Sequence, residues 1–299
     1  KQRYRHAITA QERLRPMPKW NRRKWIAAAA ATTAVVLPLY ARYIEPHWLQ
    51  VVRRSLPLRN LPTAWHGKTI LHASDLHVGP PVEDWYLAKV FQTIESLRPD
   101  VICYTGDFVS GVTDLQTDQS KSLKHLPLGR IATIGILGNH DYGYAWNDIG
   151  RAQFLCARLK ERGIRMLRNQ RIRLDGLHLV GLDELWSGQL DLKTAFQGWK
   201  ANWPGIALVH NPDVVDLEGW SDFQGLILAG HTHGGQVKPP FLPPLILPVQ
   251  NRRYTSGLFS ITTERQLYIS RGIGYRIPLR FNALPELTLF ELIPGQPTG

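Results

Sequence analysis

From residue 68 onward, short apolar runs alternate with longer stretches in which apolar residues recur at helical spacing. Three runs are typical of buried strands: Thr69–Ser74, Val101–Gly106 and Ile131–Leu137. The stretches after them predict helices at Val82–Leu97, in a polar segment ending near His125, and at about Asp148–Arg162. On the first of these helices we expect five residues to face the core: Trp85, Ala88, Val90, Phe91 and Ile94.

The second half of the chain predicts shorter strands. Four are expected at Ile172–Leu174, His178–Leu182, Ile206–His210 and Leu226–Ala229, and closely spaced ones follow around Ser256–Thr262, Gln266–Ser270 and Glu286–Ile293. Strand–helix alternation followed by a strand-rich end is typical of an α/β fold in which two packed sheets are flanked by helices. We therefore expect a four-layer α/β/β/α sandwich of two mixed sheets.

The N-terminal part has a different pattern, because Trp25–Ala41 is a run of seventeen residues without a charge. Residues 1–24 contain nine Lys or Arg against a single acid. We expect three segments before the main domain: a basic tail (1–24), a membrane-anchor helix (25–44) and a connector (45–67) that supplies an edge strand. A buried Ala-rich helix is the alternative to the anchor.

The flanking charges bear on cleavage and orientation. Asn21–Ile26 resembles a twin-arginine export signal, but no convincing cleavage site follows it, so an uncleaved anchor is favoured. The cations in front of the apolar run favour a cytoplasmic N-terminus and an extracytoplasmic main domain. Further cations follow the run, so the cytoplasmic face stays open as the alternative: Arg42, Arg53, Arg54, Arg59 and Lys68.

Composition narrows the class of protein. With 299 residues, 43% of them hydrophobic, the chain can form one large domain with a buried core, expected at 68–293 before a short tail at 294–299. The net charge is +12, but residues 1–24 supply +8, so no basic nucleic-acid-binding face is implied and no nucleic-acid partner is expected. Two cysteines, Cys103 and Cys156, exclude a disulfide framework and a cysteine-based zinc module.

Metal-binding side chains follow several of the apolar runs. They occur in five motifs: Asp75-Leu76-His77, Gly106-Asp107, Gly138-Asn139-His140-Asp141, His210 and Gly230-His231-Thr232-His233. In open α/β sheets, ligands collect where the carboxyl ends of strands converge, so separate segments can deliver side chains to one point. The glycines before the proposed ligands permit unusual backbone angles and close approach. Mixed carboxylate and imidazole ligands around two divalent cations, about 4 Å apart, are a usual arrangement for hydrolysing phosphate esters.

This ordered set resembles the calcineurin-like metallophosphoesterase superfamily over about 68–293. The resemblance implies two divalent metal ions with Asp107 bridging, one held by Asp75, His77, Asp107 and His233, the other by Asp107, Asn139, His210 and His231. It also implies that His140 is the catalytic histidine, which stabilises the phosphoryl group or protonates the leaving oxygen, with Asp141 orienting it. Neutral His and Asn ligands favour Mn²⁺, Fe or Zn²⁺ over Ca²⁺, and the sequence does not choose among those three.

Four stretches resemble the membrane-associated branch of that superfamily: Gly230–Gln236, Tyr268–Gly274, Pro278–Arg280 and Pro285–Glu286. The branch includes bacterial phosphodiesterases and a UDP-2,3-diacylglucosamine hydrolase of lipid A synthesis, which implies a phosphodiesterase or pyrophosphatase acting at the membrane on a nucleotide-linked or phosphorylated lipid. The Pro-rich loop Lys238–Pro248 carries five large apolar side chains, as a rim for acyl chains or as an ordinary packed loop. Three arginines are candidates for binding a second phosphate, with salt bridges to Glu264 or Glu286 as the alternative: Arg271, Arg276 and Arg280.

Two other functions stay open. Lipid A precursors are processed on the cytoplasmic face, so an extracytoplasmic domain favours a broad phosphodiesterase or phosphatase that acts on soluble or cell-wall phosphodiesters. A non-catalytic scaffold with the same fold is a third hypothesis, but such a protein is expected to lose ligands and all seven positions are filled here. The tryptophans, Trp146 and Trp186 among them, are interpreted as packing residues.

Overall fold

The computed structural model describes residues 21–295, so most of the expected basic tail and the expected tail after Gly295 lie outside the described residues. The chain divides into two compact units between Leu39 and Tyr40. The first contains α1 (Arg22–Leu39), in which no side chain is buried, and this disfavours a buried Ala-rich helix. By length and composition, the helical segment Arg22–His47 could cross a membrane, a property that anchors share with signal sequences.

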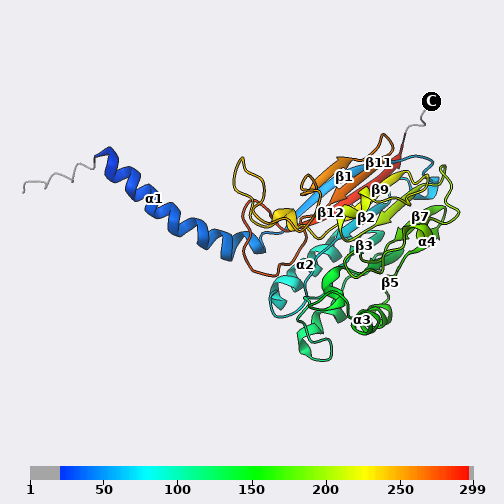
Figure 1. Ribbon diagram of the computed structural model, residues 1–299, viewed down its shortest axis with the longest axis horizontal. Coiled ribbons are helices and arrows are strands. Elements are labelled where there is room, and N and C mark those ends of the chain that lie inside the picture. Colours follow the sequence, from blue (N-terminus) through cyan, green and yellow to red (C-terminus); the bar gives the residue numbers. More distant parts are fainter. Residues whose placement is uncertain (1–20, 296–299) are drawn as a thin grey trace, which may run out of the picture. The chain divides into compact units, whose positions relative to one another are not determined.

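The second unit is a sandwich of two mixed six-stranded sheets with helices on the outside (Figure 1). The first sheet has the order β1 (Gln50–Leu58), β12 (Glu286–Pro294), β2 (Thr69–Ala73), β3 (Val101–Thr105), β4 (Ala132–Ile136) and β5 (Arg165–Met166). The second has the order β10 (Gly257–Ser260), β11 (Arg265–Ile269), β9 (Gly225–Ala229), β8 (Gly205–Leu208), β7 (Leu177–Gly181) and β6 (Gln170–Leu174). The α-helices of this unit are α2 (Asp84–Leu97), α3 (Ile149–Glu161) and α4 (Leu192–Phe196). The predicted α/β sandwich is confirmed.

Among the described residues the core has three parts, one between the two sheets and one on the outer face of each sheet. Strand alternation explains how one sheet contributes to two of them. On β2, Ile70 packs between the sheets, whereas its neighbour Leu71 packs towards α2 and α3. On β3, Cys103 packs between the sheets and Tyr104 on the helical side. Because successive side chains of a strand point to opposite faces, a strand covered on both sides is a continuous apolar run. Cys103 is accordingly a free thiol buried on β3.

The connector contributes to the first sheet. Its strand β1 lies at the edge and pairs in parallel with β12, with Gln50 opposite Glu286. Leu56 and Leu58 of β1 are buried in the core between the sheets. The edge strand expected from this stretch is therefore present, and it belongs to the unit that begins at Tyr40.

The buried face of α2 differs from the one expected. Trp85 and Ala88 are exposed, whereas Tyr86 and Leu87 are buried with Val90, Phe91 and Ile94. Leu87, Val90 and Ile94 recur at spacings of three and four residues, so they form one stripe that Ala88 does not join. The Trp85 ring instead lies 4.9 Å from the ring of His47.

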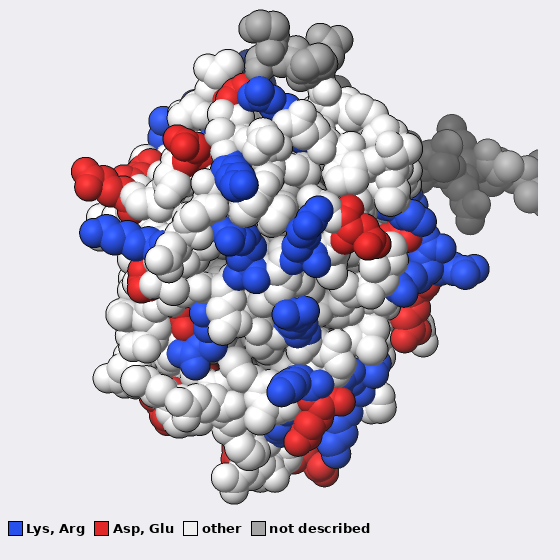
Figure 2. All heavy atoms as spheres, turned by 90° about the vertical axis from the view of Figure 1, so that its right-hand side faces the viewer, with Lys and Arg blue, Asp and Glu red and all other residues white. Residues whose placement is uncertain are grey.

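Other local differences are small. Strand β5 and helix α4 were not predicted, and the polar segment Asp118–His125 is a 3₁₀ helix. Further short helical turns occur at Tyr40–Ile44, Glu45–His47, Thr63–Trp65, Asn139–Tyr142, Pro212–Asp216 and His233–Gly235. On the face shown in Figure 2, Lys and Arg side chains are spread over the middle of the surface among uncharged residues, and others gather near the right-hand edge beside Asp or Glu.

Candidate metal centre

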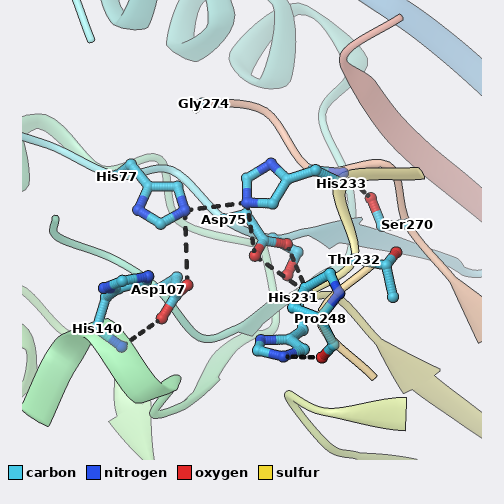
Figure 3. A network of polar contacts seen from close by, with 12 residues as sticks. Asp75, His77, Asp107, His140, His231, Thr232, His233, Pro248, Ser270 and Gly274 are labelled. Carbon is cyan, nitrogen blue, oxygen red and sulfur yellow. Dashed lines mark hydrogen bonds and ion pairs between the residues drawn. The ribbon is translucent and has the colours of Figure 1, made fainter. Parts of the chain in front are cut away.

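Proposed ligands from distant segments of the chain come together, and Figure 3 shows Asp75, His77, Asp107, His231 and His233 among them. Strands β2, β3 and β4 are parallel neighbours in the first sheet, and β8 and β9 are parallel neighbours in the second. The proposed ligands follow these strands in turn: Asp75 and His77 after β2, Asp107 after β3, Asn139 after β4, His210 after β8, and His231 and His233 after β9. The carboxyl ends of parallel strands lie at the same edge, so side chains far apart in sequence meet there.

One group of atoms lies around His233. Its Nε2 is 3.5 Å from Oδ1 of Asp75 and 3.1 Å from Nε2 of His77. The same His77 nitrogen is 3.5 Å from Oδ2 of Asp107. Asp75, His77 and His233 form one of the clusters in which single ligand atoms all lie within 4.8 Å of one another.

A second group lies around His210. Its Nε2 is 3.4 Å from Oδ2 of Asp107, 3.2 Å from Oδ1 of Asn139 and 3.2 Å from Nδ1 of His231. Oδ2 of Asp107 is therefore within 3.5 Å of a nitrogen in each group. The Asp107 carboxylate therefore lies between the two groups, which is the position that a bridging ligand requires.

His210 and His231 each have one ring nitrogen that faces the other ring (the inner nitrogen) and one that faces a backbone carbonyl (the outer nitrogen). The hydrogen bonds of the outer nitrogens show whether the inner nitrogens carry a proton. Nδ1 of His210 lies 2.8 Å from the carbonyl oxygen of Thr105, and Nε2 of His231 lies 2.8 Å from that of Pro248. Only a protonated nitrogen can donate to a carbonyl, so in neutral imidazoles both inner nitrogens carry lone pairs. These inner nitrogens are 3.2 Å apart, and their repulsion is relieved only by a positive charge between them. The donor set therefore fits a metal ion.

Burial keeps most of these imidazoles uncharged. It lowers the pKa of His77 and of His231 to about 3 and holds the pKa of His233 well below its ordinary value. His210 differs: burial opposes its charge, but Asp107, Asp75 and Glu184 raise its pKa to about 10. In the absence of a metal, a proton on His210 thus supplies the positive charge, and a divalent cation would displace it.

The backbone at the site is strained. Five of the seven proposed ligands have positive φ although none is glycine: Asp75 (55°), His77 (49°), Asp107 (51°), His231 (71°) and His233 (50°). A non-glycine residue in this region is disfavoured by roughly 1–2 kcal/mol. Backbone hydrogen bonds hold the conformation, because Asp75 N donates to Gly106 O at 3.0 Å and His77 N donates to Asp107 O at 3.0 Å. Strain held in this way is typical of functional sites.

Two glycines allow the segments to approach. A Cβ on Gly138 would lie 2.3 Å from Oδ1 of Asp107, and one on Gly230 would lie 1.9 Å from Oγ of Ser74. Both distances are far below van der Waals contact, so any larger residue would move a proposed ligand or its support. The expected close approach at these glycines is confirmed.

His140 and Asp141 take different places. The backbone N of His140 donates to Oδ1 of Asp107 at 2.9 Å, and the His140 ring lies 5.2 Å from the His77 ring, between ring centroids. Asp141 accepts hydrogen bonds from the backbone N of Gly138 at 2.9 Å and of Val109 at 3.1 Å. Both of its oxygens thus hold the loop backbone, and any orientation of His140 acts through that backbone.

The three candidate arginines also differ. Arg280 is fully buried and donates to the carbonyl oxygens of Arg271, Ala283 and Gly274 at 2.9, 2.7 and 2.7 Å. Arg271 donates to Glu286 at 2.6 Å, so for this residue the salt-bridge alternative is found. Arg276 is exposed, and its charge contributes to lowering the pKa of nearby histidines of the site, after the larger effect of burial.

Sequence reasoning missed one wall of the site. Between ring centroids, Trp186 lies 4.4 Å from His231 and 4.7 Å from Trp146. Trp146 in turn lies 6.3 Å from His140. Glu184 is buried beside them, and its Oε1 has no hydrogen-bond partner among the described residues. Burial raises the pKa of Glu184 to about 7 although the charge of His210 opposes this. The available signal was position, because Glu184 follows β7 much as Asp107 follows β3.

Comparison with known proteins agrees with this geometry. A family model described as calcineurin-like phosphoesterase matches residues 68–235. The metallophosphoesterase YkuE of Bacillus subtilis is 34% identical over 294 positions, covering 92% of this chain and 99% of the relative. Phosphodiesterase YaeI of Escherichia coli is 33% identical, covering 91% and 99%. UDP-2,3-diacylglucosamine pyrophosphatase LpxG of Chlamydia trachomatis is 30% identical, covering 89% and 97%.

Proposed function

Since this chain belongs to the calcineurin-like phosphoesterase family, it is a metallophosphoesterase, and we propose that it cleaves a phosphodiester or pyrophosphate bond in a nucleotide-linked or phosphorylated lipid. The observation that carries the hydrolytic part is the place of Asp107, whose Oδ2 lies within 3.5 Å of His77 on one side and His210 on the other. A single carboxylate between two imidazole groups is what a dinuclear site requires.

We assign the ligands by group. One divalent ion is held by Asp75, His77, Asp107 and His233, and the other by Asp107, Asn139, His210 and His231. When bound, two such ions lower the pKa of water and neutralise the charge on the phosphate oxygens. Nitrogen and oxygen ligands without a thiolate suit Mn²⁺, Fe or Zn²⁺.

The remaining residues handle the substrate and its leaving group. His140 is largely buried at the site, and burial lowers its pKa while Asp107 opposes the shift. We assign to its imidazole the stabilisation of the phosphoryl group and proton transfer to the leaving oxygen. Asp141 positions His140 by holding the backbone of Gly138, and Arg276 is the exposed cation available to a second phosphate.

Three observations support a lipid-linked substrate. The segment Arg22–His47 has the length and composition of a membrane span, so the domain would work at a lipid surface. The loop Lys238–Pro248 returns to the site at Pro248, beside His231, and several of its apolar side chains are exposed. The Chlamydia relative is a pyrophosphatase of a nucleotide-linked lipid by name. In this proposal the domain is anchored to the membrane through its N-terminal helix.

A second candidate is a broad extracytoplasmic phosphodiesterase. The cations before Trp25 favour export of the domain, and the Escherichia coli relative is named only as a phosphodiesterase. A reporter fused after Gly67 would report which side of the membrane the domain occupies. Reporter activity outside the cytoplasm would favour this second candidate over a step in lipid A synthesis.

A substrate panel tests the proposal. The full-length chain, purified in detergent and loaded with Mn²⁺, is incubated with UDP-2,3-diacylglucosamine and with bis(p-nitrophenyl) phosphate, and the products are identified. We expect release of UMP from the lipid, and no hydrolysis of either compound by Asp107→Asn. Cleavage of the soluble ester alone would refute the lipid substrate and leave the second candidate. Fewer than one metal ion per chain after loading would instead support the hypothesis of a non-catalytic scaffold.

A further inference from the structure

The loop Lys238–Pro248, called the apolar loop below, exposes large apolar side chains to an unusual degree. Phe241 is completely exposed, and Ile246, Leu245 and Leu242 are 79%, 69% and 59% exposed. These four residues lie within six consecutive positions, so the exposed apolar surface is contiguous. Contiguous surface of this kind on a folded domain marks a contact with another molecule or with a membrane.

Packing within the domain accounts for only one side of this loop. Pro244 and Leu247 are buried, and a Cβ on Gly235 would lie 2.1 Å from Pro244, so these two segments are in close contact. Nη2 of Arg252 donates to the carbonyl oxygen of Pro244 at 3.2 Å. The inner side of the loop is therefore fixed, and the interpretation as an ordinary packed loop leaves the four exposed side chains unexplained.

The composition of the loop suits lipid. Residues 239–249 contain no charged residue and five prolines. Proline has no backbone N–H, so it leaves no unsatisfied hydrogen-bond donor when it enters an apolar medium. Cations flank this stretch, with Lys238 before it and Arg252 and Arg253 after it. An apolar tip between cations matches an apolar layer beneath anionic headgroups, whereas a water-soluble protein partner would not require flanking cations.

The loop is also continuous with the end of the candidate membrane span. That span ends at His47, and Ala41 O accepts a hydrogen bond from Arg280 N at 2.9 Å. One residue further, Phe281 N donates to Gln236 O at 2.9 Å, and Phe281 O accepts from Lys238 N at 2.9 Å. Backbone hydrogen bonds thus join three segments: the end of the span, residues 280–281 and the start of the apolar loop.

Further apolar residues lie along the same connection. Tyr43, Ile44 and Trp48 are more than half exposed near the end of the span, and so is Ile277, whose carbonyl oxygen accepts a hydrogen bond from Gln236. Tyrosine and tryptophan are enriched where proteins meet the headgroup region of a membrane. In Figure 1 the chain from residue 40 enters its unit on the side where the apolar loop lies.

We propose that the apolar loop inserts into the surface of the same lipid bilayer that the N-terminal span enters, with Phe241, Leu242, Leu245 and Ile246 below the headgroups. Two attachments then hold the domain, one through the span and one through the loop. Because the loop returns to His231 through Pro248, the metal centre faces the headgroup layer. The contact is independent of the substrate and holds equally for a lipid and a soluble phosphodiester.

Site-directed fluorescence on the full-length chain tests this contact. In a Cys156→Ser background, Ile246→Cys is labelled with an environment-sensitive dye, and the protein is reconstituted into phosphatidylcholine–phosphatidylglycerol vesicles. Phe154→Cys on α3, another exposed apolar position, serves as the matched control. We expect a blue-shifted emission at position 246 that lipids with a spin label in the acyl chain quench, and a water-like, unquenched emission at position 154. A far-UV circular dichroism spectrum and a thermal unfolding midpoint that match those of the unlabelled parent chain verify that each labelled chain is folded.

Two results at position 246 would overturn the proposal. Emission at position 246 that matches position 154 would mean that the loop stays in water. A blue shift that spin-labelled lipids fail to quench would mean that protein, such as a second copy of this chain, covers the loop. In a second variant, Leu242→Cys carries the dye together with Phe241→Ser and Leu245→Ser, and we expect quenching to fall by more than half relative to Leu242→Cys alone. Unchanged quenching would show that these side chains do not drive insertion. None of these readouts depends on which ester is cleaved.

Discussion

Nε2 of His210 and Nδ1 of His231 face each other across 3.2 Å, and the other nitrogen of each ring is bound to a backbone carbonyl. The carbonyls of Thr105 and Pro248 therefore fix both the orientation and the tautomer of the two rings. Oδ2 of Asp107 lies 3.4 Å from the same His210 nitrogen and 3.5 Å from Nε2 of His77. The side chains are thus already arranged around positions that require positive charge.

Replacing the shared carboxylate should empty both metal positions. We expect Asp107→Asn to retain less than half of the wild-type metal and to lose at least about 10³-fold in hydrolysis, because several kcal/mol of charge stabilisation disappear. Metal analysis after loading and gel filtration, combined with a bis(p-nitrophenyl) phosphate assay, measures both effects. Asp118→Asn, at an exposed carboxylate away from the site, is the control. Full metal content in Asp107→Asn would show that this carboxylate does not bridge.

Removing the His140 imidazole should separate chemistry from metal binding. No ligand-distance contact of its ring with Asp75 or Asp107 is found within residues 21–295, so we expect His140→Ala to keep its metal. Turnover should fall by about 10²–10⁴-fold, the usual contribution of a positioned acid or base. The exposed His125→Ala is the matched control. A parallel loss of metal from His140→Ala would make His140 a ligand.

The residues at the carboxyl ends of the strands could be predicted from the sequence because they are determined by local sequence patterns. An apolar run that ends in glycine and a polar side chain specifies both a buried strand and the residue at its carboxyl end, as in Thr105–Gly106–Asp107. The order of such runs then implies two sheets. What converges at one edge follows from parallel pairing, which the resemblance to a known superfamily also implied.

The remaining features depend on contacts between distant segments. Arg280 looked available for phosphate, but the carbonyl oxygens that surround it belong to loops whose paths the sequence does not reveal. Trp85 follows the helical pattern, yet the burial of Tyr86 and Leu87 turns it towards His47. The burial of Glu184 depends on the pairing of β7 with β8, two strands that are separated in sequence by α4.

The exposed arginine should affect substrate binding more than catalysis. We expect Arg276→Ala to reduce kcat/KM roughly tenfold for a substrate with two phosphates, mainly through KM, because a charge-assisted hydrogen bond contributes about 1.5–3 kcal/mol. Steady-state kinetics on a pyrophosphate and on a monophosphate diester measure this difference. Arg173→Ala, at an exposed arginine on β6, is the control. Equal losses on both substrates would mean that Arg276 does not recognise the second phosphate.

Glu184 gives a pH dependence with a defined sign. Burial raises its pKa from 4.5 to about 7, so between these values the folded protein holds a proton that the unfolded chain has released. The free energy of unfolding therefore decreases as the pH rises through this window. The upper limit of the decrease is roughly 3 kcal/mol, at 1.36 kcal/mol per pH unit. Below pH 4.5 both states are protonated and the contribution is fully present.

Glu184→Gln should remove this dependence. The amide oxygen can still accept the hydrogen bond that Ser187 N donates to Glu184 at 2.7 Å, and the amide does not ionise. For the metal-free protein, we expect thermal unfolding of the two chains to coincide near pH 4.5, with the variant more stable at pH 8. Loading with Mn²⁺ should shrink the difference, because nearby cations stabilise the carboxylate and lower its pKa. A variant that is less stable than wild type at pH 8 without metal would show that a charged Glu184 stabilises the fold.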